Sequence, residues 1–290
     1  MTRADLVAAA GEAIRHGSKS FHTASRLFDR HTRERAWLLY SWCRHCDDQC
    51  DGQALGHGRA LPANGAVAQA AALTELALSG RPTGHLAFDA LGAVVAECAI
   101  PHFYVRDHLA GFALDAAGWR PEDEADLIGY CYNVAGAVGC MMAIVMGVPA
   151  EDEETLRRAS DLGTAFQLSN IARDVRDDHE AGRCYLPADW LDAHGIDPRD
   201  PLRPDRRDRL VALVARLCDL AERYEVSAMH GISRLPFRSR WAILSAARIY
   251  GRIGRRVAAL GPRAWDERVV VPKREKAVIM MSAFRRALAA

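Results

Sequence analysis

Apolar residues recur every three or four positions along most of the 290-residue chain, which is the spacing of one face of an α-helix. Helix-breaking residues, chiefly Gly and Pro, separate the segments that show this pattern. The segments predicted to be helical are 5–16, 33–52, 64–79, 84–98, 103–118, 123–147, 152–180, 205–229, 236–260 and 272–288. Alternation with a period of two is confined to Val269, Val270 and Val271, within the stretch 268–272. The pattern therefore predicts an all-α fold.

The breaks between the predicted helices are neither long nor polar enough to be linkers between domains. They lie at 52–64, 80–84, 118–121, 182–187 and 198–204. No internal repeat or low-complexity tract accompanies them. We therefore expect a single domain over residues 1–290, a helical bundle with a central cavity between its helices.

The longest apolar run, residues 134–148, is interrupted only by glycines and falls short of the roughly 20 residues that span a bilayer. A buried core helix is the better interpretation. Residues 1–16 mix charged side chains into an alanine-rich stretch, which is unlike a signal peptide. The eight cysteines are irregularly spaced, as expected of reduced thiols. Together these features predict a cytoplasmic protein.

The overall charge is nearly balanced, with 38 basic and 37 acidic side chains and a formal net charge of +1. This balance gives no support to nucleic acid as a partner. The last third of the chain is nevertheless biased toward Arg and Lys. A solvated surface is the default explanation of that bias, and peripheral contact with anionic lipid headgroups is the alternative. The sequence does not predict an oligomeric state.

A first group of acidic residues lies on the predicted helix 33–52. At about 100° per residue, Tyr40, Arg44, Asp47 and Asp51 share an arc of roughly 60°, and Asp48 lies beside it. Like charges four residues apart destabilise a helix, and a divalent cation would offset them. Hard cations such as Mg²⁺ prefer carboxylate oxygens, often one or two together with substrate phosphates. A solvated acidic face near a helix end is the alternative for this segment taken alone.

A second polar ladder lies on the predicted helix 152–180. Gln167, Asn170, Asp174 and Asp178 follow the spacing i, i+3, i+7, i+11 and occupy an arc of about 80°. Apolar residues around them predict a mostly buried helix. Two amides followed by two carboxylates on one face form a poor surface pattern and a good series of oxygen ligands. The two helices together predict a site for metal ions and a diphosphate.

Metal ions at such a site would neutralise the charge that develops on a leaving diphosphate, so that an allylic carbocation can form. The cation must then be kept from water in a closed apolar cavity. A competing zinc or iron–sulfur interpretation rests on Cys43, Cys46 and Cys50. Buried thiols acting as small apolar side chains explain that spacing better. No glycine-rich loop follows a strand, which argues against a Rossmann-type dinucleotide domain.

Several segments of the chain resemble the squalene/phytoene synthase family, most of all its bacterial phytoene-forming members. They follow one another in the family's order over nearly the whole chain. These segments are 17–21 (GSKSF), 40–51 with Asp47-x-x-x-Asp51, 130–139 (YCYNVAGAVG), 167–174 (QLSNIARD), which opens a second box with Asp174 and Asp178, and 182–187 (GRCYLP). The resemblance implies an isoprenoid-synthase-type fold.

The resemblance also implies a reaction. Two geranylgeranyl diphosphates would condense head to head into a cyclopropyl diphosphate, which would ionise, rearrange and lose a proton to give phytoene, a carotenoid precursor. The implied partners are prenyl diphosphates, and the implied cofactor is Mg²⁺, with Mn²⁺ as an alternative. No nicotinamide cofactor is expected.

The family's functional residues map onto matching positions of this chain. The implied metal ligands are Asp47, Asp51, Asn170, Asp174 and Asp178. The four carboxylates among them also count as catalytic, together with Tyr130 near the reacting carbons. The implied substrate-binding residues are Tyr40, Arg44, Gln167, Asn170, Tyr250 and Arg268, with Lys19 and Ser20 on a flap over the site.

Two other functions stay open at this stage. A squalene or dehydrosqualene synthase of the same fold would act on the shorter farnesyl diphosphate. A non-catalytic helical protein that keeps the fold for binding or assembly is a rival of a different class. Such a protein would be expected to lose the ligand carboxylates, all four of which are present in this sequence.

Overall fold

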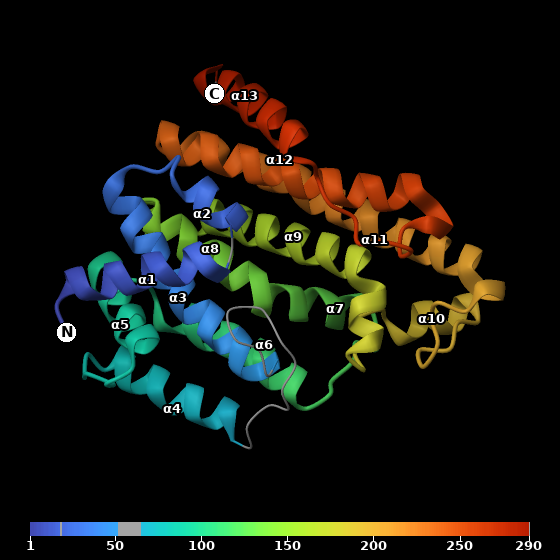
Figure 1. Cartoon of the computed structure of the whole chain (residues 1–290), viewed down its shortest axis with the longest axis horizontal. Coiled ribbons are helices and arrows are strands. Elements are labelled where there is room, and N and C mark those ends of the chain that lie inside the picture. Colours follow the sequence, from blue (N-terminus) through green and yellow to red (C-terminus); the bar gives the residue numbers. More distant parts are fainter. Residues whose placement is uncertain (18, 52–64, 290) are drawn as a thin grey trace.

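The computed structural model describes residues 1–17, 19–51 and 65–289, apart from the side chains of residues 19–21, 50 and 51. Within these ranges the regular elements are helices and no strand is present (Figure 1). The first part of the chain contains α1 (Arg3–Gly17), α2 (Lys19–Ser25), α3 (Arg30–Asp51), α4 (Ala66–Leu78), α5 (Leu86–Cys98), α6 (His102–Ala116), α7 (Glu124–Cys131), the π-helical turn η1 (Tyr132–Gly136) and α8 (Ala137–Val145). The second part contains α9 (Glu153–Glu180), α10 (Ala188–His194), η2 (Pro204–Arg206), α11 (Arg207–Ala228), η3 (Met229–Arg234), α12 (Phe237–Leu260), η4 (Gly261–Arg263) and α13 (Lys273–Ala289). The predicted all-α fold is confirmed.

Every segment predicted to be helical contains a helix. Two helices, α2 and α10, have no counterpart among the predictions. Each is seven residues long, about two turns, which is too short for a three-and-four spacing to stand out. The stretch 268–272 keeps its alternation, since Val269 and Val271 are buried while Val270 is exposed. It has no neighbouring strand among the described residues and so forms none.

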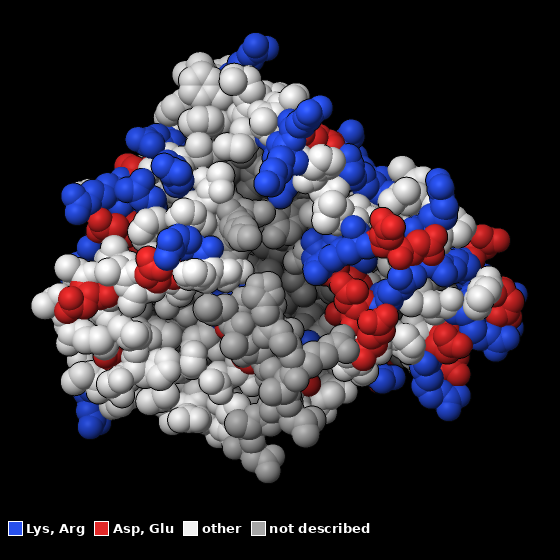
Figure 2. Space-filling model, viewed as in Figure 1, with Lys and Arg blue, Asp and Glu red and all other residues white. Residues whose placement is uncertain are grey.

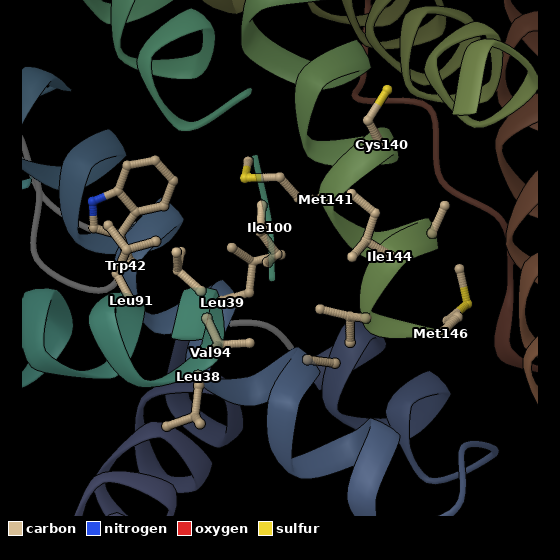
Figure 3. Close-up of a cluster of buried hydrophobic side chains, with 14 of the residues drawn as sticks. Leu38, Leu39, Trp42, Leu91, Val94, Ile100, Cys140, Met141, Ile144 and Met146 are labelled. Atoms are coloured by element: carbon tan, nitrogen blue, oxygen red, sulfur yellow. The ribbon is translucent and has the colours of Figure 1, made fainter. Parts of the chain in front are cut away.

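The interior consists of two large clusters of buried apolar side chains. The first joins α3, α5, α6 and α8, and Figure 3 shows part of it, with Leu39 and Trp42 of α3 near Leu91 of α5 and Met141 of α8. The second joins α7, α9, α10, α11 and α12. The helix α9 runs through the middle of the molecule and contacts α7, α8, η1, α11 and α12 (Figure 1).

Glycines allow η1 and α8 to approach α9 at backbone distance. A Cβ on Gly163 would lie 2.2 Å from the carbonyl oxygen of Ala135, and one on Gly139 would lie 2.3 Å from that of Ala159. No side chain fits in those gaps, so the two backbones are locked together.

The helical stretch Glu124–Val145 comprises α7, η1 and α8. Among the described residues it is the one stretch long and apolar enough to cross a membrane, and half of its most apolar window is buried. It packs against α6 and α9 in the interior (Figure 1). These contacts confirm the predicted core helix around residues 134–148.

The cysteines behave as buried thiols. All seven whose side chains are described are free, and Cys46 is completely buried. Burial, chiefly, raises the pKa of the Cys43 thiol to about 12, so this group stays protonated. Cys50 lies outside the described side chains. These features agree with the prediction of reduced thiols.

The close approach of η1 to α9 generates a stability prediction. We expect Gly163→Ala to lower the free energy of unfolding by about 1–3 kcal/mol, because its Cβ would overlap the Ala135 carbonyl. Gly129→Ala is the matched control, since a Cβ at this helical position meets no atom within 4 Å. This variant should raise the free energy of unfolding by at most about 1 kcal/mol. Urea unfolding followed by circular dichroism measures both, and equal effects would contradict the packing argument.

Candidate active site

A cavity of about 710 Å³ lies between α3, α6, α7–α8, α9 and α12. Figure 2 shows a hollow near the centre of one face of the molecule, with acidic and basic side chains gathered along one side of it. Along α9 the lining residues run from Thr155 to Asp178, which corresponds to a rise of about 35 Å. The cavity is therefore long enough for an extended hydrocarbon chain.

The α3 wall carries the first polar group predicted from the sequence. Tyr40, Arg44 and Asp47 all line the cavity. The Arg44 guanidinium donates to the Asp47 carboxylate at 2.5 Å and, more weakly, to the Tyr40 hydroxyl at 3.4 Å. Asp48 is buried beside them, 3.7 Å from Arg44. The helical spacing thus places a cation and carboxylates on one face, as predicted.

The α9 wall carries the second ladder. Gln167, Asn170, Asp174 and Asp178 all line the cavity, and the Asn170 amide donates to the Gln167 oxygen at 3.4 Å. Two arginines pair with Asp174. Arg173 holds both carboxylate oxygens, and Arg268, from the segment after α12, donates to Oδ2 at 3.1 Å.

The Asp178 carboxyl is electrostatically unfavourable in its charged form. Burial, followed by the negative charge of Asp174, raises its pKa to about 8, although the nearby Arg183 acts in the opposite direction. Oxygen ligands crowded in this way gain stability from a cation. A cation bound near Asp178 would favour the ionised form of this carboxyl group.

Two aromatic contacts complete the α9 side of the cavity. Tyr250 of α12 stacks on Phe166, with centroids 4.1 Å apart and planes at 19°. The indole of Trp265 donates to the Ala172 carbonyl at 3.0 Å and so fixes the following segment against α9. This anchor brings Arg268 to the cavity, where the sequence predicts it.

Tyr130 also lines the cavity, in a cluster that the sequence analysis does not predict. Its hydroxyl donates to Asp115 of α6 at 3.1 Å, and the hydroxyl of Tyr185 donates to the other oxygen of Asp115 at 2.8 Å. Asp115, Arg173, Arg183 and Tyr185 are lining residues that were not assigned a role. The last three lie within motifs quoted above, whereas Asp115 is an isolated acid at the end of an apolar helix.

Three predicted residues cannot be placed at the cavity. The side chains of Lys19, Ser20 and Asp51 lie outside the described part of the structure. Their backbones belong to α2 and to the last residue of α3. The predicted flap and the second carboxylate of the first box therefore stay predictions.

The carboxylates do not form a closed metal cage. Among the described side chains, no three of His, Cys, Asp and Glu converge on one metal position. Mg²⁺ does not require this, because it keeps waters and often binds through one or two carboxylates plus substrate phosphates. Asp47 on one wall and Asp174 with the raised-pKa Asp178 on the other fit that mode of binding.

Most of the remaining wall is apolar, although Thr155, Arg158 and His108 also line it. The apolar lining includes Phe28, Leu39, Met146, Ile232 and Leu235, all buried. The ladder of amides and carboxylates is confined to residues 167–178, toward one end of α9. Such a division suits a ligand with a charged head and a long hydrocarbon tail.

A sequence profile of the squalene/phytoene synthase family matches residues 14–275 of the chain. The chain belongs to the squalene/phytoene synthase family. It is 43% identical over 292 residues to a 15-cis-phytoene synthase of Pantoea ananas, covering 99% of this chain and 94% of that protein. It is 45% identical over 277 residues to a 15-cis-phytoene synthase of a Paracoccus strain, covering 94% and 88% respectively.

Solved structures of this family have the same fold. A dehydrosqualene synthase in complex with a ligand superposes with a TM-score of 0.88 at 25% identity, covering 99% of this chain and 98% of that one. A squalene synthase from Alicyclobacillus acidocaldarius superposes with a TM-score of 0.75 at 24% identity, covering 90% and 95%. The expected isoprenoid-synthase-type architecture is confirmed.

The raised pKa of Asp178 predicts a pH-dependent stability effect in metal-free protein. Its folded pKa of about 8 exceeds the ordinary value of 3.8, so the free-energy cost of this group appears above about pH 4 and grows until about pH 8. We expect Asp178→Asn to raise the melting temperature at pH 8 by roughly 2–4 °C, and by less at pH 5. Glu180→Gln, an exposed acid on the same helix, is the control for scanning calorimetry. An unchanged melting temperature at pH 8 would contradict the assigned crowding.

Proposed function

We propose that the chain catalyses the phytoene synthase reaction. Two geranylgeranyl diphosphates are joined head to head through a cyclopropyl diphosphate, two pyrophosphates leave, and phytoene is formed for carotenoid biosynthesis. The observation that carries this proposal is the identity of 43–45% over most of the chain to relatives named phytoene synthase. The long cavity with one charged end supports it.

The charged end binds the diphosphate in this proposal. Mg²⁺ held by Asp47, Asp51, Asn170, Asp174 and Asp178 would neutralise the leaving pyrophosphate, with Mn²⁺ as the alternative ion. Arg44 and Arg268 already lie against Asp47 and Asp174. These guanidinium groups would also be available to bind the phosphate oxygens, for which their paired N–H donors are well suited.

The apolar wall protects the carbocation that ionisation leaves behind. Phe166 and Tyr250 stand between the charged end and the hydrocarbon region. Their faces carry partial negative charge and attract a cation that passes close by. Leu39, Met146 and Leu235 are buried and present a largely apolar surface to this cation.

A squalene or dehydrosqualene synthase activity on farnesyl diphosphate is the second candidate. The superposition on a dehydrosqualene synthase favours it, although at 25% identity. The two activities differ in the length of the hydrocarbon that the apolar part of the cavity accepts. A product assay with C15 and C20 diphosphates and Mg²⁺, run without and with NADPH, separates them.

The metal site gives the sharpest test of catalysis. In that assay we expect Asp174→Asn to lower the phytoene formation rate at least about 100-fold, because a carboxylate that binds the metal becomes a neutral amide. Helical content should stay near that of the unchanged protein. Glu180→Gln on the exposed face of α9 should retain full activity. Undiminished turnover in Asp174→Asn would remove this helix from the catalytic site.

We also propose peripheral contact with anionic membranes through α13. Val278, Met281 and Leu288 follow i, i+3, i+10 spacing on this helix and are 69%, 61% and 65% exposed. Residues 237–289 carry 13 Lys or Arg and 3 Asp or Glu. A second copy of the chain would bring the same positive charge to this face, whereas anionic lipid complements it.

Vesicle sedimentation checks this contact. We expect the pair Val278→Ser and Met281→Ser to reduce binding to vesicles containing phosphatidylglycerol at least about tenfold, since two apolar side chains no longer enter the interface. Phe103→Ser, which changes another exposed apolar residue, on α6, is the control. Equal loss of binding in the control and in the α13 pair would contradict membrane contact through α13. Equally strong binding to neutral vesicles would contradict the preference for anionic lipid.

A further inference from the structure

Three side chains from distant parts of the sequence meet at one wall of the cavity. Asp115 is the second-last residue of α6, Tyr130 lies near the end of α7, and Tyr185 follows α9. Both phenols donate to Asp115, one to each carboxylate oxygen, at 3.1 and 2.8 Å. All three residues line the same cavity as the charged ladder on α9.

The aromatic rings hold this cluster rigidly. Tyr130 and Tyr185 stack with centroids 4.9 Å apart and planes at 19°. Trp119 stacks on Tyr130 with a centroid separation of 5.5 Å and an angle of 24°. Burial, followed by the negative charge of Asp115, raises the pKa of both tyrosines. Each phenol therefore keeps its proton and stays a hydrogen-bond donor to Asp115.

The proposed function, on which this inference rests, requires a proton acceptor at its last step. The rearranged carbocation must lose a proton to become phytoene, inside a cavity that excludes water. Asp47, Asp174 and Asp178 are the carboxylates assigned to the metal in that proposal. His108 lines the cavity, but its Nε2 is enclosed by protein.

We propose that Asp115 is the final proton acceptor, reached through the Tyr130 hydroxyl, and that Tyr185 is a positioning residue. The C–H bond beside the cationic carbon breaks, and its electron pair forms the new C=C bond. The proton bonds to the Tyr130 oxygen while the phenolic proton of Tyr130 passes to Asp115 Oδ2. Asp115 becomes neutral and later returns its proton to the released pyrophosphate.

Tyr185 acts through Asp115 rather than on the substrate. Its hydrogen bond to Oδ1 fixes the carboxylate so that Oδ2 faces Tyr130. Without that bond the carboxylate loses one of the contacts that orient Oδ2 toward Tyr130, and the fraction of productive arrangements falls. Removing this hydrogen bond should therefore raise the ratio of cyclopropyl diphosphate to phytoene. Binding of the C20 diphosphate should stay the same, since in this proposal Tyr185 does not hold the substrate.

The test follows the fate of labelled C20 diphosphate in Asp115→Asn, Tyr130→Phe and Tyr185→Phe. Asp115→Asn should still form the cyclopropyl diphosphate and should accumulate it, with phytoene formation lowered at least about 100-fold. Tyr130→Phe should behave alike. Tyr185→Phe should lower kcat about tenfold, raise the ratio of intermediate to phytoene and leave KM unchanged.

A matched pair elsewhere in the structure serves as control. Tyr132 donates to Asp107 at 2.6 Å, the same phenol–carboxylate contact, but neither residue lines the cavity. Tyr132→Phe and Asp107→Asn should keep the ratio of intermediate to phytoene. Circular dichroism and melting temperatures of all variants separate misfolding from a change in chemistry.

The outcomes distinguish this inference from the proposed function. Phytoene formation by Asp115→Asn within about threefold of the unchanged protein would overturn the role of Asp115. Complete loss of the cyclopropyl diphosphate in a folded Asp115→Asn variant would also overturn it, by placing Asp115 in the first step. An unchanged protein that releases no pyrophosphate from C20 diphosphate would instead refute the proposed function itself.

Discussion

The contact on which the site depends is the one between the backbones of η1–α8 and α9. Gly139 and Gly163 bring these helices together so closely that even a methyl group would collide with a carbonyl oxygen. Packing at this distance leaves no freedom to slide or rotate. The side chains that α9 presents to the cavity are therefore fixed relative to Tyr130, which precedes η1 in the same continuous helical stretch. The π-helical turn falls at this junction, and its Asn133 carbonyl lies 3.2 Å from His108 Nδ1, which ties α6 to the same arrangement.

At the charged end of the cavity, acidic groups lie close together at a cost in stability. Asp174 is paired with two arginines, whereas Asp178 is left in surroundings that disfavour its charge. A fold selected for stability alone would separate these groups or replace them. Their proximity on a mostly buried helix fits the proposed binding of a cation at this end of the cavity. The two arginines already orient the Asp174 carboxylate within it.

Much of this site could be predicted because residues three, four or seven positions apart lie on the same face of a helix. Gln167, Asn170, Asp174 and Asp178 lie on one helix, and a single period places all four. The cluster of Asp115, Tyr130 and Tyr185 could not be found in this way, since it joins three elements separated by 15 and 55 residues in sequence. Arg268 was predicted only through the family resemblance, because what brings it to the cavity is the Trp265 anchor on α9. The short helices α2 and α10 and the π-helical turn were missed because each is about two turns or less. The roles of Lys19, Ser20 and Asp51 stay predictions, since their side chains lie outside the described part of the structure.

The Trp265 anchor also bears on when, during synthesis, the protein can first act. The helix α9 is complete at Glu180, but Tyr250 and Arg268 leave the ribosome some 70–90 residues later. Until Trp265 reaches the Ala172 carbonyl, the polar end of the cavity lacks one of its walls and stays open to water. A growing chain therefore holds both carboxylate ladders well before it can enclose a diphosphate. The segment that completes the polar end of the cavity is thus synthesised after all of the helices that carry the two acidic groups.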